Sequence, residues 1–237
     1  MIFTKIQDPD LSQLEYEKSI RAKLIAADSR LFCTPGVLYH DPVKGIIEFE
    51  HLKELTPLKR SVPYKDDLTS VFLRVGSALA TIHSHLSLPQ EMTKRVPGNW
   101  KSGEDVFLHG DFSLVNMSYN PESDCLFVFD WNCSDWLGQL STTGTNHIDL
   151  LTLIHSFFVV KDMNQVLLKR SLNYIRAFLQ GYQDESGSTV NLDDLNHNLQ
   201  IVHQRYLDHK KSTPRFEPYR RSMKYLENSL WLKELKT

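Results

Sequence analysis

Cysteine is scarce in this chain of 237 residues, which has three: Cys33, Cys125 and Cys133. Their spacing matches no metal site, and an odd number does not form the closed framework of a small secreted, disulfide-rich protein. We therefore expect three reduced thiols that are buried by packing, as in a cytoplasmic protein.

Long apolar runs and an excess of one charge are also missing. The longest apolar region, 148–160, contains Asp149 and His155 and is too short to span a bilayer, and the N-terminus lacks the apolar core of a signal peptide. The net charge of −2 indicates neither nucleic acid nor a membrane surface as a partner. What remains, with 41% hydrophobic residues and no internal repeat, is a globular protein of one large domain or two lobes.

The chain does contain a concentrated polar motif in the stretch 108–131, LHGDFSLVNMSYNPESDCLFVFDW. The apolar segments 106–108 and 126–129 are predicted as short strands, one before and one at the end of this stretch. Turn residues at 120–124 lie between them and predict that the two strands form a hairpin.

Such a hairpin would bring Asp111, Asn116 and Asp130 to one edge. Two carboxylates and an amide oxygen can hold Mg²⁺ on a nucleotide and orient a hydroxyl for phosphoryl transfer. Each residue also has a plainer interpretation: Asp111 as a turn residue, Asn116 as a loop cap and Asp130 as a strand-end carboxylate. The order and spacing of the whole set favour the functional interpretation.

This stretch resembles the aminoglycoside phosphotransferase and choline kinase group of small-molecule kinases. The resemblance lies in the pattern HGD, four residues, Asn, an apolar strand and then DW. The resemblance implies a protein-kinase-like fold in which Asp111 is the catalytic base and the catalytic residues Asn116 and Asp130 are the metal ligands. His109 would support the loop structurally. Asp149, at the start of a predicted helix over 147–160, would brace the same loop. Alternatively, it would simply be a carboxylate at the helix N-terminus that the helix dipole stabilises.

The first fifty residues predict a strand over 1–6, a helix from about 11 to 27, and strands at 36–39 and 46–49. We expect Ser12 to cap the helix. Set against the same family, this part resembles the second half of a nucleotide-binding lobe.

Four residues of this part are then implied to bind the nucleotide. Lys5 would hold the phosphates, although an exposed lysine on an edge strand is the alternative. Glu17 would be its ion-pair partner, with Glu15 as the competing choice; Ile20 and Leu24 favour Glu17 because they place apolar contacts on its side. The segment 48–51, with Glu48 and Glu50, resembles the hinge whose backbone meets the adenine ring.

The remainder is helical in pattern, with predicted helices at 66–86, from about 164 to 182, from about 192 to 209 and at 219–235. The loop 132–146 takes the place of an activation segment. The fold class is therefore α+β and protein-kinase-like, with a reduced N-terminal lobe (1–58) that contains a small antiparallel sheet and a mainly helical C-terminal lobe (59–237).

The family's glycine-rich hairpin would precede the lysine strand, yet only four residues stand before Lys5. We expect either a truncated chain or a lost phosphate lid. Ser113 stands where protein kinases of the HRDLK type have a lysine, which points to a small acceptor. Basic residues between Arg205 and Arg221 predict a solvated face or, alternatively, a site for an anionic acceptor.

The predicted function is transfer of the γ-phosphate of ATP, or another nucleoside triphosphate, with Mg²⁺ to a hydroxyl of a sugar, an amino alcohol or an aminoglycoside-like molecule. The alternative is a pseudokinase that acts as a binding or scaffold protein. A metal-dependent hydrolase using Asp111 and Asp130 is a third interpretation, which lacks the usual histidine ligands. The sequence does not identify the acceptor or the oligomeric state.

Overall fold

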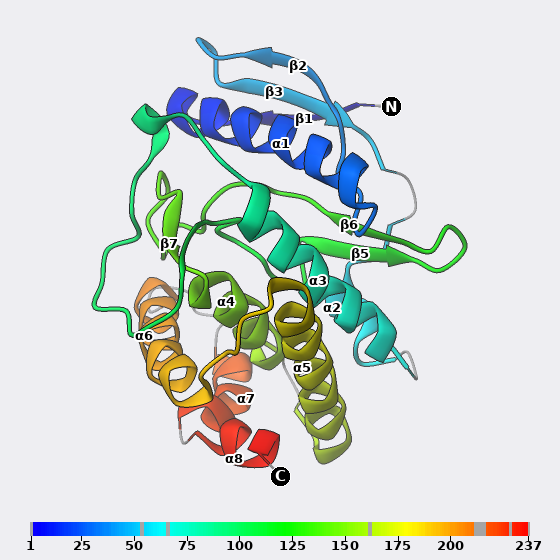
Figure 1. Cartoon of the computed structure of the whole chain (residues 1–237), viewed down its shortest axis with the longest axis vertical. Helices are drawn as coiled ribbons and strands as arrows, with labels where there is room; N and C mark the ends of the chain where they lie inside the picture. Colours follow the sequence, from blue (N-terminus) through cyan, green and yellow to red (C-terminus); the bar gives the residue numbers. More distant parts are fainter. Residues whose placement is uncertain are drawn as a thin grey trace.

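A three-stranded antiparallel sheet with one long helix forms the N-terminal part of the computed structural model (Figure 1). The model describes residues 2–52, 55–64, 67–160, 163–210, 217–227 and 229–236. Strands β1 (Ile2–Ile6), β2 (Val37–Asp41) and β3 (Ile46–Glu50) are arranged in the order β1-β3-β2. The predicted strands are therefore present, and β1 forms an edge of the described sheet, with Lys5 opposite Ile47.

The buried face of helix α1 (Pro9–Ser29) is partly polar. Asp8, and not Ser12 as we expected, caps it: the Asp8 side chain accepts from the Asp10 N–H, and Pro9 is in the first turn, where its missing N–H costs nothing. We expected Leu24 to make apolar contacts on the side of Glu17, and this is wrong because the Leu24 side chain is 68% exposed. The buried residues are instead Ser12, Leu14, Glu15, Lys18, Ser19, Ala22, Ile25 and Ala26.

The hairpin that we predicted between the strands at 106–108 and 126–129 is wrong, because each of these strands pairs with another segment. Strand β4 (Asp105–Phe107) pairs with β7 (Thr143–Thr145), which lies in the segment that we predicted as a loop. The hairpin around the turn at 120–124 consists of β5 (Met117–Asn120) and β6 (Cys125–Val128). The short turn joins the two segments directly on either side of it. The partner of β6 is therefore β5, whose sequence MSYN has no strong apolar pattern.

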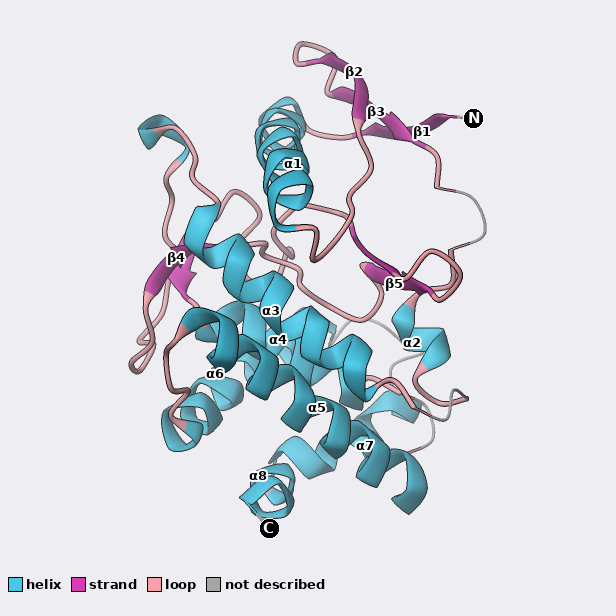
Figure 2. Ribbon diagram, turned by 45° about the vertical axis from the view of Figure 1, so that its right-hand side comes forward, coloured by secondary structure: helices cyan, strands magenta, loops and turns pink. Residues whose placement is uncertain are grey.

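The helices gather in the other half of the molecule (Figure 2). Helices α3 and α5 cross so closely that a Cβ at Gly76 would lie 2.1 Å from the Phe178 carbonyl oxygen. The predicted helix at 219–235 is divided in two, α7 and α8, by Ser229 with a φ of 52°. Besides α1, the described helices are α2 (Leu58–Ser61), α3 (Thr69–His85), α4 (His147–Phe158), α5 (Gln165–Ser186), α6 (Leu192–Lys210), α7 (Glu217–Glu227) and α8 (Leu230–Lys236), with a 3₁₀ turn at Gln90–Met92.

The segment that follows α1 is joined to β6. Cys33 donates its N–H to the Leu126 carbonyl (2.7 Å) and accepts from the Val128 N–H (2.9 Å), and its sulfur is bonded to Cys125. The expectation of three free thiols is therefore wrong for two of them; Cys133 alone is free, and it is buried.

Within the described residues, no helix combines the length and the hydropathy needed to cross a bilayer. The cytoplasmic location and the lobe boundary at residue 58 stay predictions.

Candidate active site

The β5–β6 hairpin brings Asn116 and Asp130 together. Met117 pairs with Val128, so Asn116 and Phe129 are opposite at the open end, where the Phe129 N–H donates to the Asn116 carbonyl at 3.1 Å. Asp130 follows with a φ of 64°, a left-handed conformation that aspartate tolerates better than most residues. The sequence prediction of convergence at a hairpin edge is correct for this pair, although it named the wrong hairpin.

Asp111 reaches the same place from the loop before β5. The Asn116 side-chain nitrogen donates to the Asp111 carboxylate at 2.9 Å and to the Asp111 carbonyl at 3.0 Å. Burial raises the pKa of Asp111 to about 6, and the negative charge of Asp130 adds to the rise, against the opposing hydrogen bond from Ser134. A carboxyl with this pKa can accept a proton near neutral pH, as a general base must.

Lys5 connects the N-terminal sheet to this group. Its ammonium lies 2.6 Å from Glu15 Oε1 and 2.6 Å from Asp130 Oδ1. Burial alone would lower the pKa of Lys5, but the two carboxylates outweigh it and raise the pKa above its ordinary value. The ion-pair role that we predicted for Glu17 is wrong: Glu17 pairs with Arg21 on its own helix.

Glu15 also holds residues that the sequence analysis missed. Its second oxygen accepts from the side-chain nitrogens of Gln7 (2.8 Å) and Asn132 (2.8 Å). Asn132 comes directly after the DW motif, and its amide ties the segment after β6 to α1. A polar amide at this place was the available signal.

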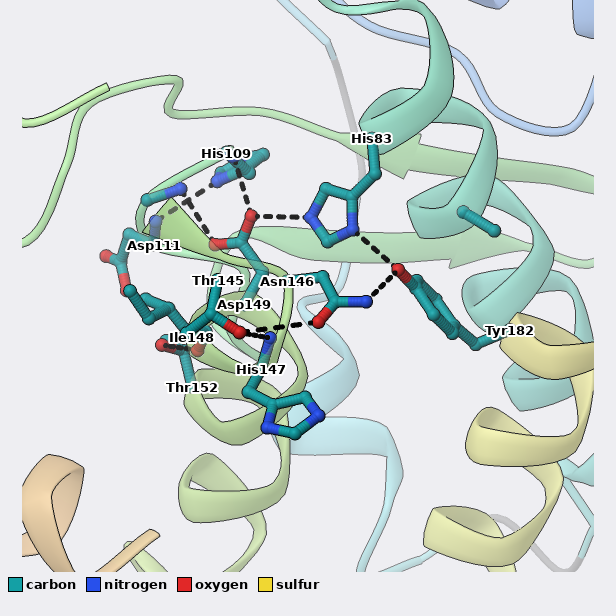
Figure 3. Close-up of polar contacts among 12 residues, drawn as sticks. His83, His109, Asp111, Thr145, Asn146, His147, Ile148, Asp149, Thr152 and Tyr182 are labelled. Carbon is teal, nitrogen blue, oxygen red and sulfur yellow. Dashed lines mark hydrogen bonds and ion pairs between the residues drawn. The ribbon is translucent and has the colours of Figure 1, made fainter. Parts of the chain in front are cut away.

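Asp149 organises the loop that carries Asp111 (Figure 3). Its carboxylate accepts from the backbone N–H groups of His109 (2.7 Å) and Gly110 (2.9 Å) and bonds His83 Nε2 at 3.0 Å. Burial raises the pKa of Asp149, but the His83 contact and the backbone donors outweigh it and leave the pKa below its ordinary value. His83 bridges Asp149 and the Tyr182 hydroxyl.

The His109 ring lies inside the loop. It is fully buried, its Nδ1 accepts from the Asp111 N–H at 3.2 Å, and its centroid is 4.5 Å from that of Trp131. Burial lowers its pKa to about 4, so the ring is neutral at pH 7 and cannot act as an acid there. The supporting role that we expected for His109 stays a prediction.

Two cavities meet at Asp130. The first has a volume of about 360 Å³ and combines an apolar wall with polar groups. It is lined by Phe3, Lys5, Glu15, Pro35, Phe49, Glu50, His51, Leu52, Leu55, Pro57, Asn116, Ser118, Phe129, Asp130 and Trp131. The second, of about 310 Å³, is lined by Asp111, Asp130, Asn132, Cys133, Ser134, Asp135, Trp136 and His209. Asp130 therefore lines both cavities, whereas Asn116 lines the first and Asp111 lines the second.

The two glutamates of the expected hinge differ in position. Glu50 lines the first cavity, but its N–H already donates to the Gly36 carbonyl (2.9 Å) and its carboxylate binds the Gly36 N–H. Glu48 is paired with Thr4 inside the sheet. Since these backbone groups are engaged, His51 and Leu52, which also line the cavity, are better placed to meet a ligand's ring.

Neither a protein-family model nor a curated protein matches this sequence. Solved structures do match. The choline kinase LicA from Streptococcus pneumoniae has a TM-score of 0.56 and 15% identity, over 96% of this chain and 86% of that one. The chain has a choline-kinase-like fold.

Two further structures match with lower TM-scores. A choline/ethanolamine kinase family protein from Mesorhizobium loti has a TM-score of 0.43 and 14% identity, over 93% of this chain and 86% of that one. The gentamicin–APH(2″)-IIa complex has a TM-score of 0.46 and 14% identity, over 95% and 84%. The predicted α+β, protein-kinase-like fold class is confirmed by the match to the choline kinase LicA.

The donor atoms at the junction of the cavities fit a hard cation. Asn116 uses its nitrogen toward Asp111, which leaves its amide oxygen as a possible ligand beside the Asp130 carboxylate. Mg²⁺ usually takes one or two protein oxygens and completes its shell with water and phosphates. In the described part of the chain, no group of three or more histidine, cysteine or acidic side chains could hold a metal ion.

Proposed function

We propose that this protein is a phosphotransferase that moves the γ-phosphate of ATP, with Mg²⁺, to a hydroxyl group of a small molecule. The observation that carries the proposal is that Asp130 is shared by two cavities, with Lys5 and Asn116 facing one and Asp111 facing the other. Phosphoryl transfer needs this arrangement, because donor and acceptor must meet in line at one phosphorus atom.

The first cavity suits the nucleotide. Its apolar wall, which includes Leu52 and Leu55, can cover the base, and Lys5 and Asp130 mark the end for the phosphates. A bound Mg²⁺ would offset charge on the phosphates, held by Asn116 and Asp130. Lys5 would then exchange its contact with Asp130 for a phosphate oxygen while it keeps Glu15.

The second cavity suits the acceptor. Asp111 would orient the acceptor hydroxyl and take its proton, for which a pKa of about 6 is suitable. Asp111, Asp130 and Asp135 line this space together, so a neutral or cationic acceptor fits better than an anionic one. His209 also lines the cavity, but the three carboxylates argue against the anionic acceptor considered from the sequence.

The first experiment measures nucleotide binding and transfer in parallel. Saturating Mg²⁺-ATP should raise the melting temperature by about 5 °C, because a ligand that binds only the native state stabilises it. A screen of amino alcohols, sugars and aminoglycosides for transfer of labelled γ-phosphate should then find an acceptor. Asp111→Ala and Asp130→Ala should each abolish transfer.

The matched control is Asp124→Ala in the turn of the same hairpin. Asp124 is exposed and bonds Arg74, away from both cavities, so its variant should keep full turnover. Undiminished transfer in the Asp111 or Asp130 variant would refute the assignment.

A nucleotide-binding protein without transfer is the second candidate. The observation in its favour is the direct contact of Lys5 with Asp130 at 2.6 Å, which a magnesium ion has to displace. A thermal shift with Mg²⁺-ATP and no transfer to any acceptor would support this candidate over the enzyme.

A further inference from the structure

One peptide plane in the catalytic loop is held at both of its ends. The His109 carbonyl accepts from Lys18 Nζ at 2.6 Å, and the Gly110 N–H donates to Asp149 Oδ1 at 2.9 Å. These two groups belong to the same planar peptide unit, so the pair of contacts fixes its rotation about the chain.

The orientation of this plane decides where Asp111 lies. Gly110 has a φ of 93°, and a Cβ there would lie 2.8 Å from the Cys133 Cα, so only glycine fits. Because glycine has wide conformational freedom, the local sequence does not fix the plane by itself. Asp111 follows directly, and a turn of the plane would move its carboxylate away from the second cavity.

Lys18 reaches this plane from the N-terminal part of the molecule. It stands three residues after Glu15, on the same face of α1, and both side chains are buried. Through Glu15 the helix holds Lys5, and through Lys18 it holds the loop that carries Asp111. One rigid helix thus contacts the groups assigned to the nucleotide and to the acceptor.

Stability alone does not explain a lysine at this position. Its side chain is fully buried, and removing an ammonium group from water costs free energy that the carbonyl contact and the nearby carboxylates of Glu15 and Asp149 recover only in part. Burial lowers the pKa of Lys18 in spite of these carboxylates, which reflects the same cost. An unbranched apolar side chain of similar length would remove this cost, which offsets the loss of the donor to the His109 carbonyl.

We infer that Lys18 is a positioning residue for the transfer reaction, which orients the His109–Gly110 peptide and through it the Asp111 carboxylate. The inference rests on the proposed function. It extends that function by giving α1 a direct role in placing the catalytic base.

The kinetic test compares Lys18→Met with the wild-type protein and with Ser19→Ala as a matched control. Ser19 is the next residue of α1, equally buried, and it makes no described side-chain hydrogen bond. Lys18→Met should lower kcat about 10²-fold, the size expected for a small misplacement of a catalytic group. The KM for ATP, the thermal shift with Mg²⁺-ATP and the melting temperature should not fall, and Ser19→Ala should match wild type.

Amide hydrogen exchange at Gly110 gives a readout that needs no turnover. In Lys18→Met the plane is free to rotate off Asp149, so exchange at Gly110 should be about tenfold faster or more, while exchange in α3 stays unchanged. If the wild-type protein transfers no phosphate at all, the proposed function fails, and this exchange rate still decides whether Lys18 fixes the His109–Gly110 peptide plane.

Two results would overturn the inference. One is unchanged kcat together with unchanged exchange at Gly110 in Lys18→Met. The other is a loss of kcat that accompanies an equal loss of thermal stability and nucleotide binding, which would make Lys18 a structural residue only.

Discussion

At the scale of single residues, the pKa of Asp111 links its chemistry to stability. Burial raises this pKa from 3.8 to about 6, so between those pH values the folded protein binds more protons than the unfolded chain. The free energy of unfolding therefore falls as the pH rises through this window, since ionising the buried carboxyl is unfavourable. Below about pH 4 the effect is absent, and above about pH 6 it is complete.

Asp111→Asn should consequently be more stable than wild type at pH 7 and equal to it at pH 4. The expected gain is about 1 to 3 kcal/mol, from a pKa shift of about two units at 1.36 kcal/mol each. Urea unfolding at the two pH values measures it. A variant that is less stable than wild type at pH 7 would show that the Asp111 carboxylate supports the fold instead.

The same pKa predicts how turnover depends on pH. The base must be ionised, so kcat/KM, which reports the free enzyme, should fall about tenfold per pH unit below about pH 6. The measurement is a profile of kcat/KM from pH 5 to 8, with Asp124→Ala as the control that should give the same profile. A flat profile down to pH 5 would exclude Asp111 as the base.

At the scale of one element, α1 separates two glutamates that the sequence left as rivals. Glu15 bonds Lys5, Gln7 and Asn132, while Glu17 bonds Arg21 on the more exposed side. The sequence reasoning chose Glu17 because it assumed that a helix buries its most apolar face. This helix covers a polar site, so its buried face is polar.

Glu15→Gln and Glu17→Gln form a matched pair with the same chemical change. Glu15→Gln removes a buried partner of Lys5 and should weaken Mg²⁺-ATP binding about tenfold or more, since breaking a part-buried charge pair costs a few kcal/mol. Glu17→Gln removes only a surface pair and should change binding less than about twofold. Titration calorimetry with Mg²⁺-ATP measures both, and equal effects would restore Glu17 as a candidate.

At the scale of the whole molecule, the Cys33–Cys125 bond joins the segment after α1 to β6 across 92 residues of sequence. A cross-link over so long a segment restricts the unfolded chain and should stabilise the protein by about 2 to 5 kcal/mol. Dithiothreitol should therefore lower the melting temperature of the wild-type protein. The Cys33→Ser/Cys125→Ser double variant should already have the lower value and should not respond to the reductant.

That control is clean because the remaining thiol, Cys133, is buried, and burial raises its pKa to about 12, which makes it unreactive. If dithiothreitol leaves the wild-type melting temperature unchanged, the bond does not contribute to stability.

Much of the fold follows from local sequence. The apolar periodicity at 66–86 and in α4 to α6 predicted those helices, and the alternating segments predicted β1, β2 and β3. For the site, order and spacing predicted that Asp111, Asn116 and Asp130 come together, and the resemblance to the small-molecule kinases implied the position of Asp149. These signals are local, because each depends on residue types within a few positions of one another.

The tertiary structure decided what local patterns cannot express. Four features depend on contacts between distant segments or on a helix turned toward a site: the pairing of β4 with β7, the polar face of α1, the Cys33–Cys125 pair and the contact of Lys18 with the His109 carbonyl. A lysine on a helix is normally solvated, and only the packing of α1 against the catalytic loop buries this one. The sequence thus determined which groups are available for the chemistry, and the tertiary contacts determined how they are held, because burial and long-range pairing are properties of the folded chain as a whole.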